Sequence, residues 1–417
     1  WNEKFKSIMD NGGFDCVIGN PPYIFARSGM FSDNEKEYYY KKFSLVQYQL
    51  NTYLLFVEIG IKLLKAKGFF GFIIPNTWQT IDNFSKFRKF LFENISELSI
   101  VNVIDKVFSE ANVDTSILTF NNLMGTHHNV KLFSSVNSKF EKIFEGDPKN
   151  FGQDYVVRFS NSSYDEINNI MEKIESKSIL LEAISTVKAG LKAYEIGKGT
   201  PKQTENMKNN RIYHSNKKID KTYFRYLEGK DVCRYSLKWG GLFLKYGDCL
   251  AAPRDFELFN SERILVRQIP SKPPYCINAI LTGEVYLNDI NSMIVYNIKN
   301  YDSKYILSLL NSKLISFWFN SKFNKLQRGI FPQFKVKELK IFPIPKNSSK
   351  EIQKLIFFSD EMLSLNKKLQ EIGDKNTMEK EKIQKEIQKT DKEIDELVYQ
   401  LYGITEEEKK IIEESLK

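Results

Sequence analysis

The first 120 residues alternate between short apolar runs and segments that place apolar residues at helical spacing. This pattern predicts strands at 14–19, 69–75, 100–104 and 115–120, and helices at 51–65 and 84–92. Gly68 follows the first of these helices and is its expected C-cap. Because strands and helices alternate, we expect an α/β domain with a mostly parallel sheet.

The pattern changes twice further along the chain. Strand-like runs become short and are interrupted by Gly, Pro and Asn, with one helix expected at 304–320. Two long, charged amphipathic patterns then follow, separated by a turn at 373–376 and ended by Gly403, and they predict an antiparallel helical hairpin. We therefore expect four parts: an α/β domain over 1–135, a connector over 136–178 with a helix at 164–176, an irregular β-rich α+β domain over 179–346, and the hairpin over 347–417.

Positive charge is concentrated in one stretch of the third part. The chain has 61 Lys and Arg, 52 Asp and Glu, and a net charge of +9. Residues 185–275 hold 18 of the basic and 9 of the acidic residues, so the rest of the chain is balanced. A local excess of this kind is typical of a surface that neutralises phosphates. Charge alone leaves a solvated basic face with no partner equally open.

Composition excludes several other classes of protein. The sequence lacks the run of roughly 18–20 uncharged apolar residues that spans a bilayer, and it lacks a signal segment. The four cysteines form no CxxC pair, so we expect reduced thiols in a cytoplasmic protein and no metal site. His127, His128 and His214 are interpreted as surface loop residues. Because the chain begins at Trp1, close to a mid-domain strand, we expect it to be a fragment of a longer protein.

The strongest chemical signal is the motif Asn20-Pro21-Pro22-Tyr23, directly after the strand at 14–19. In α/β folds this end of a strand faces the ligand site. The Asn20 side-chain oxygen and the Pro21 carbonyl are two acceptors, which can bind both hydrogens of a planar amine and make its nitrogen more nucleophilic. Proline fixes φ and stiffens the loop, and the ring of Tyr23 offers a flat surface to a base. The structural alternative is a proline-rich turn with a packed tyrosine.

Residues 14–23 resemble motif IV of the gamma-class N6-adenine DNA methyltransferases, and 51–65, 68–78 and 103–120 resemble later segments of that fold. The resemblance implies a partial Rossmann-like methyltransferase sheet in which Asn20, Pro21 and Tyr23 grip a flipped adenine. By position, Phe108 would cover the other face of the base and Pro22 would lie beside the methyl donor. The family uses S-adenosylmethionine and transfers the methyl group directly, with no metal. Its main donor pocket lies upstream of motif IV, so we expect that pocket to be missing and the isolated chain to be inactive.

The third part resembles the TaqI-like specificity domain of such enzymes and of single-chain type IIG restriction–modification proteins. The matching stretches are 184–192, 226–235, 263–269 and 328–345. This resemblance implies double-stranded DNA as the partner, with an upstream nuclease possible in the same polypeptide. The basic residues that could contact phosphates or base edges are Lys188, Lys192, Arg211, Lys217, Lys218, Arg225, Arg234, Arg254 and Arg267.

Together these signals favour a target-recognition module joined to a site-specific adenine-N6 methyltransferase of a restriction–modification or phage-defence system. Two alternatives remain open at this point. The chain could be a DNA-specificity module in which the methyltransferase remnant is only a scaffold. It could also methylate RNA or protein, because an amide nitrogen presents similar chemistry to the same motif.

Overall fold

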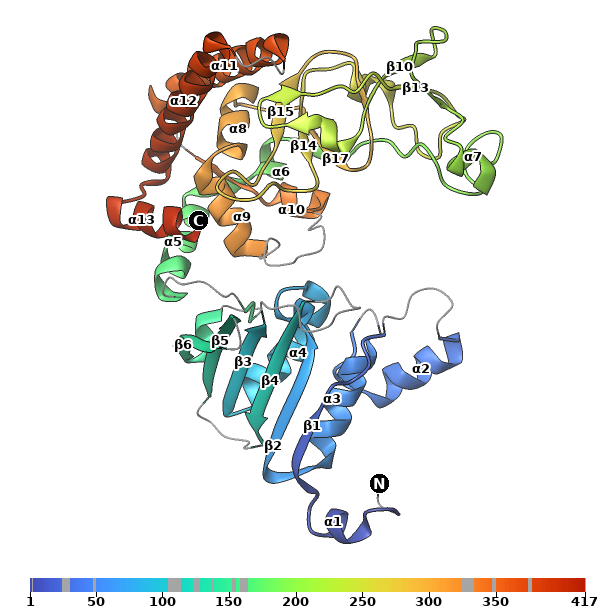
Figure 1. Cartoon of the computed structure of the whole chain (residues 1–417), viewed down its shortest axis with the longest axis vertical. Helices are drawn as coiled ribbons and strands as arrows, with labels where there is room; N and C mark the ends of the chain where they lie inside the picture. The colour runs from blue at the N-terminus through green and yellow to red at the C-terminus, as the bar shows by residue number, and fades with distance from the viewer. Residues whose placement is uncertain are drawn as a thin grey trace. The chain divides into compact units, whose positions relative to one another are not determined.

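The computed structural model describes residues 1, 3–24, 31–47, 50–103, 114–122, 128–136, 139–151, 155–157, 164–323, 334–346, 350–373 and 377–416. The chain divides into two compact units, here called unit 1 (mainly Trp1–Asn168) and unit 2 (Asn169–Leu326 and Phe331–Lys417). Each unit has its own core and is described by itself (Figure 1).

Unit 1 is built on a sheet of strand order β1-β2-β4-β3-β5-β6. The strands are β1 Phe14–Gly19, β2 Leu64–Pro75, β3 Glu97–Val103, β4 Thr115–Asn121, β5 Asn129–Val136 and β6 Lys139–Gly146. The helices are α1 Lys6–Asp10, α2 Asp33–Lys42, α3 Thr52–Leu63 and α4 Ser85–Asn94, with short 3-10 turns η1 Asn76–Gln79, η2 Asp82–Phe84 and η3 Pro148–Phe151. The strands and helices expected from the hydrophobic pattern are therefore present.

The expectation of a mostly parallel sheet holds for four of the six strands, because β1, β2, β3 and β5 run in one direction. β1 pairs with β2, and β3 with β5, in parallel, but β4 runs antiparallel to both of its neighbours, β2 and β3. The hydrophobic pattern locates strands but carries no information on their direction, so it could not show that β4 returns between β2 and β3. β6 then pairs antiparallel with β5. The sheet thus reaches Gly146, within the range 136–178 that the sequence suggested as a connector.

The two faces of this sheet differ. The side chains of Phe70 and Phe72 on β2 point into a core that also contains residues of α3 and α4, and all are buried. On the opposite face of β1 and β2, Ile18 is 83% and Phe69 60% exposed. Figure 1 shows α3 and α4 on one side of the sheet only. Because sheets built from βαβ units normally bury both faces, this open apolar face has the character of an interface.

Gly68 is not a helix cap. α3 ends at Leu63, and its C-cap residue is Leu64, where β2 begins. A Cβ atom at Gly68 would come within 3.0 Å of the Phe14 carbonyl oxygen and 2.9 Å of the Leu64 side chain. Glycine is therefore required here by close approach of β2 to β1 and not by the end of the helix.

Unit 2 contains short strands in small sheets, with helices around them. Its larger sheets have the orders β15-β14-β17-β8 and β16-β10-β13-β9, and β11-β12 and β18-β7 form two-stranded pairs. The strands are β7 Ser178–Leu180, β8 Thr186–Ala189, β9 His214–Ser215, β10 Tyr223–Leu227, β11 Val232–Cys233, β12 Ser236–Leu237, β13 Phe243–Lys245, β14 Arg263–Arg267, β15 Ala279–Thr282, β16 Leu287–Asn288, β17 Ser292–Tyr296 and β18 Pro343–Pro345. The helices before the hairpin are α5 Tyr164–Ser176, which begins in unit 1, α6 Leu181–Ile184, α7 Glu205–Asn209, α8 Ser303–Leu310, α9 Lys313–Phe323 and α10 Val336–Lys340, with 3-10 turns η4 Gly229–Asp231 and η5 Phe256–Phe259.

The single helix expected at 304–320 is two helices, α8 and α9, separated at Asn311. The Asn311 side chain accepts a hydrogen bond from the Ala279 backbone N–H and donates one to the Ala279 carbonyl, both at 3.0 Å. This buried amide completes the edge of β15 as another strand would. The helix break therefore serves a tertiary contact that periodicity does not reveal.

The C-terminal hairpin is present as α11 Lys350–Ile372 and α12 Met378–Tyr402, which pack on each other. Gly403 ends α12 with φ 66°. A further helix, α13 Glu406–Ser415, starts with a capping box of Thr405 and Glu408. This helix was not predicted from the sequence. α11 packs on α8, and α12 and α13 on α9, so the hairpin belongs to unit 2.

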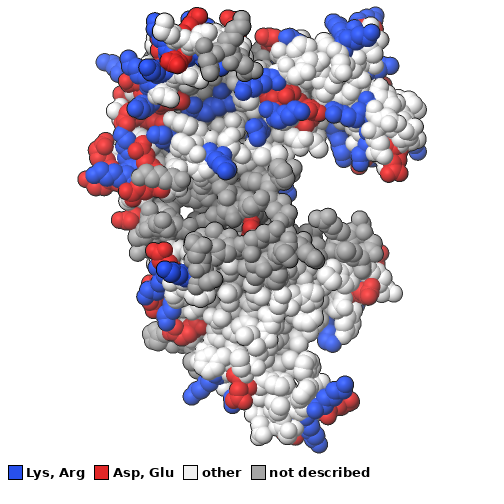
Figure 2. Space-filling view, viewed as in Figure 1, with Lys and Arg blue, Asp and Glu red and all other residues white. Residues whose placement is uncertain are grey.

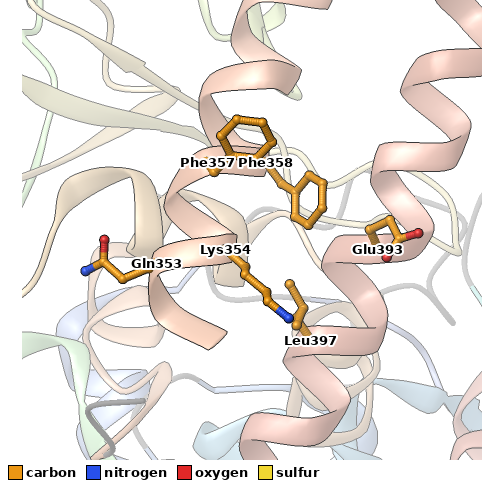
Figure 3. Close-up of a pocket in the computed structure, with 6 residues that line it drawn as sticks. All are labelled: Gln353, Lys354, Phe357, Phe358, Glu393 and Leu397. Carbon is orange, nitrogen blue, oxygen red and sulfur yellow. The ribbon is translucent and has the colours of Figure 1, made fainter. Parts of the chain in front are cut away.

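A hollow of about 440 Å³ lies between α11 and α12. Figure 3 shows Phe358 and Lys354 of α11 pointing towards Glu393 and Leu397 of α12 across it.

Among the described residues, no helix is both long and apolar enough to cross a membrane.

Candidate catalytic loop and DNA-reading surface

The Asn-Pro-Pro-Tyr loop leaves the carboxyl end of β1, where Gly19 is paired with Phe72 of β2. Asn20 is exposed and Pro21 is buried. A Cβ atom on Gly19 would lie 3.2 Å from the Phe72 ring, so a glycine lets β1 approach β2 closely just before the motif. The structure therefore presents the Asn20 side chain at the sheet edge on a loop that starts from a buried pairing.

Tyr23 is held by its hydroxyl group. The Tyr23 O–H donates a 2.9 Å hydrogen bond to the Ile73 carbonyl of β2, and the half-buried ring packs against the core of unit 1. Burial raises the pKa of the Tyr23 hydroxyl to about 12. The hydroxyl therefore stays protonated at neutral pH and remains a donor.

Thr52, the first residue of α3, contacts the same loop and was not identified from the sequence. Its hydroxyl donates a 2.5 Å hydrogen bond to the Pro22 carbonyl and accepts one of 2.9 Å from the Ile24 N–H. The Thr52 N–H in turn donates to the Ile24 carbonyl at 3.1 Å. No local signal could reveal these contacts, because 28 to 30 residues separate the partners in sequence.

Two buried amides lie at the ends of elements that meet this edge. Asn51 precedes α3 and is 2% exposed, and Asn76 follows β2 and is 7% exposed. Within the described parts of the chain, neither side-chain oxygen has a hydrogen-bond partner. Buried polar atoms of this kind are uncommon in folded proteins and cost stability.

Two other residues were expected at this site, Phe108 and Pro22. Phe108 lies outside the described residues. Pro22, expected beside the methyl donor, is exposed, and its carbonyl is bound by Thr52. The motif residues Asn20, Pro21, Pro22 and Tyr23 thus form one continuous loop, to which Thr52 of α3 is hydrogen-bonded.

Most of the basic candidates lie on the surface of unit 2, and Figure 2 shows Lys and Arg over the part that carries β10, β13 and α7. The exposed residues are Lys188, Arg211, Lys217, Lys218 and Arg254, and the partly exposed ones are Lys192, Arg225 and Arg267. Three of them form ion pairs within the protein: Lys192 with Glu195 at 2.8 Å, Arg211 with Glu228 at 2.8 Å, and Arg225 with Glu284 at 2.9 Å. Such surface pairs are weak, so the cations remain available to a phosphate.

Arg234 does not belong to this surface. Its guanidinium makes two hydrogen bonds to Asp391 of α12, at 2.8 and 2.5 Å, and one to the Asn311 carbonyl at 3.0 Å. It also stacks 3.8 Å from the centre of the Tyr275 ring, and only 17% of the side chain is exposed. The expectation that Arg234 contacts DNA was therefore wrong, because its charge is neutralised inside unit 2.

His214 is also not a surface loop residue, as the sequence suggested. It lies in β9, its Nδ1 is 3.0 Å from the Tyr194 hydroxyl, and its ring stacks on Tyr194. Burial lowers the pKa of His214 to about 4, so the imidazole is neutral at physiological pH.

Comparison with known proteins agrees with this architecture. Residues 1–108 match the family described as Eco57I restriction-modification methylase, and residues 224–344 match the TaqI-like C-terminal specificity domain. A putative type II restriction enzyme and methyltransferase of Methanocaldococcus jannaschii is 29% identical over 381 residues, which is 89% of this chain and 31% of that protein. The Eco57I restriction enzyme and methyltransferase of Escherichia coli is 36% identical over 87 residues, or 21% of this chain and 9% of that protein. This chain thus spans about a third or less of the length of these relatives.

Among solved structures, the restriction-modification enzyme MmeI in complex with DNA matches 95% of this chain and 56% of its own chain, with a TM-score of 0.59 and 11% identity. At this identity the match concerns the fold alone. The class of protein follows from the two family matches and the Methanocaldococcus relative, which place the chain among the restriction–modification methyltransferases. More particularly, the chain belongs to the group that joins an Eco57I-type methylase domain to a TaqI-like C-terminal specificity domain.

Proposed function

We propose that this chain is the base-gripping and DNA-reading part of a site-specific DNA adenine-N6 methyltransferase from a restriction–modification or phage-defence system acting in the cytoplasm. The observation that carries the proposal is the Asn20–Tyr23 loop, which leaves the end of β1 with an exposed Asn20 and is tied to β2 and α3. The names of the relatives support DNA as the substrate.

In the proposed reaction, the Asn20 side-chain oxygen and the Pro21 carbonyl accept hydrogen bonds from the two hydrogens of the adenine amine. The nitrogen lone pair is then less delocalised into the ring, and the positive charge that develops on nitrogen during transfer is stabilised. The loop is already fixed before the base arrives, so little ordering is needed at the moment of reaction. In this proposal the Tyr23 ring, anchored at its hydroxyl, stacks on one face of the base and Phe108 on the other, and stacking offsets part of the cost of flipping.

S-adenosylmethionine is the methyl donor that the resemblance implies, and it supplies the methyl group when bound. In this proposal Pro22, which is exposed, lies beside the donor. Before β1 the described chain holds only the short helix α1, so the loop expected to bind most of the donor is not among the described residues. Because this chain spans only 31% of the length of its Methanocaldococcus jannaschii relative, we propose that the pocket belongs to another part of the parent protein.

The open face of the unit 1 sheet supports this assignment. Ile18 and Phe69 are exposed on the same face of neighbouring strands, where Phe69 is paired with Cys16 and Ile18 with Gly71, two residues along. We propose that the missing part of the methyltransferase domain covers this face. A nuclease in the same polypeptide, as in a combined restriction enzyme and methyltransferase, is part of the same proposal.

For unit 2 we propose that the exposed basic residues contact the phosphates and base edges of double-stranded DNA. The set is Lys188, Lys192, Arg211, Lys217, Lys218, Arg225, Arg254 and Arg267. Phosphate contacts would position the domain, and a minority of these side chains would read the sequence.

The test is to express the full-length parent in a methylation-deficient host and to sequence plasmid DNA for N6-methyladenine. We expect methylation at one defined sequence, and its loss in Asn20→Ala. Asn34→Ala, which changes an exposed asparagine of α2, is the matched control and should methylate normally. Unmodified DNA from a soluble, folded parent would instead favour a DNA-specificity module without catalysis, or a substrate other than DNA.

A further inference from the structure

The backbone of the Asn20–Tyr23 loop has very few free torsions. Proline fixes φ at positions 21 and 22. A following proline also restricts the residue before it, so ψ of Asn20 and ψ of Pro21 are confined to extended values. From ψ of Asn20 to φ of Pro22 the main chain is thus stiff, and the first torsion left open after this segment is ψ of Pro22, which sets where the Pro22 carbonyl points.

Thr52 fixes that angle. Its hydroxyl hydrogen is directed to the Pro22 carbonyl at 2.5 Å, and its hydroxyl oxygen accepts from the Ile24 N–H at 2.9 Å. The backbone N–H of Thr52 also binds the Ile24 carbonyl. One residue thus holds the chain on both sides of Tyr23, and it is itself 8% exposed at the first turn of α3.

The second anchor is the hydrogen bond from the Tyr23 hydroxyl to Ile73 of β2. The two anchors act on different groups: the Tyr23 bond orients a side chain, and the Thr52 bonds orient the main chain. The Pro21 carbonyl belongs to the stiff segment that ends at Pro22, so its position relative to α3 depends on the main-chain anchor.

We propose that Thr52 is a positioning residue for methyl transfer: by holding the main chain at Pro22 and Ile24 it fixes the downstream end of the stiff Asn20–Pro22 segment, which presents the Asn20 side chain and the Pro21 carbonyl to the target amine. This inference rests on the proposed function. It assigns to α3 a role in the chemistry as well as in packing, although Thr52 itself touches no reacting atom.

The experiment compares Thr52→Val with Thr52→Ser in the full-length parent. The substrate is unmethylated plasmid DNA that contains the sequence the wild-type parent methylates. Valine keeps the size and β-branching of threonine and removes both hydrogen bonds of the hydroxyl group, whereas serine keeps them. Steady-state kcat and KM for DNA are measured with a thermal unfolding curve for each variant. Thr52→Ala is the second variant, for use if buried valine prevents folding.

We expect Thr52→Val to lower kcat about 10- to 100-fold with KM for DNA changed by less than about threefold, because misalignment affects the transition state more than binding. Thr52→Ser should recover most of the rate. A purely structural role would lower the unfolding temperature and leave the kcat of the folded enzyme unchanged, and that result would overturn the proposal. If the wild-type parent itself does not methylate DNA, the proposed function fails instead, so the two failures are distinguishable.

Discussion

Arg234 and Asp391 form a two-pronged ion pair that joins the β11–β12 turn to α12 across 157 residues of sequence. The side chains are 17% and 11% exposed, so the pair is largely removed from water. Tyr275 covers the guanidinium, and its hydroxyl donates to the neighbouring Asp395 at 2.8 Å. The hairpin is therefore fastened to the specificity domain by charge as well as by apolar packing.

Removing one partner of this pair should destabilise unit 2 strongly, because the other charge would stay buried without compensation. For Arg234→Ala we expect a loss of about 3–5 kcal/mol in the free energy of unfolding, measured by urea denaturation. Arg211→Ala is the matched control, because Arg211 forms an ion pair of similar length but 48% of its side chain is exposed. It should cost less than about 1 kcal/mol. Equal losses in the two variants would contradict the assigned role of Arg234.

The exposed pair Lys217 and Lys218 should contribute to DNA affinity without contributing to stability. For the double alanine variant we expect weaker binding to duplexes of any sequence, and a slope of log affinity against log salt that is shallower by about two. Binding of the full-length parent across a salt series measures both quantities. The control removes the same charge from α12, with Lys385 and Lys389 changed to alanine; both are exposed. If this control lowers affinity equally, the effect is one of net charge and not of a binding surface.

Asp395 should make the stability of unit 2 depend on pH. It is 3% exposed, and burial raises its pKa to about 6 although Lys313 N–H and the Tyr275 hydroxyl donate to it and Lys313 Nζ lies 3.7 Å away. Arg234 also favours the charged form of Asp395, but burial outweighs these contacts. The folded state therefore holds the proton more tightly than the unfolded chain. Its contribution is complete below about pH 4 and is lost as pH rises through about 6.

The change over this window should be about 3 kcal/mol for the single group. The measurement is the free energy of unfolding from pH 4 to 7 for the wild type and for Asp395→Asn, which does not titrate. We expect the free energy of unfolding of the wild type to fall relative to that of Asp395→Asn as pH rises. Parallel curves would show that Asp395 has an ordinary pKa in the folded protein.

Much of unit 1 and of its site could be predicted because the signals are local. The strand before Asn20 and the two hairpin helices follow from periodicity within one segment. Thr52 could not be found this way, nor could Asp391 as the partner of Arg234, because both contacts join residues far apart in sequence. The same limit explains why the helix break at Asn311 and the reversed direction of β4 were not predicted: a side chain that completes a strand edge, and the direction of a strand, depend on tertiary neighbours.

The packing of α11 on α8 and of α12 on α9 sets where the recognition region can be exchanged between related enzymes. A chimera cut at residue 346 would separate Arg234 from Asp391 and leave each charge facing a foreign surface. A fragment that keeps these contacts starts near α5, because unit 2 begins after Asn168, and it includes the whole hairpin. New sequence specificities should therefore be transplanted with these helices, as one cassette.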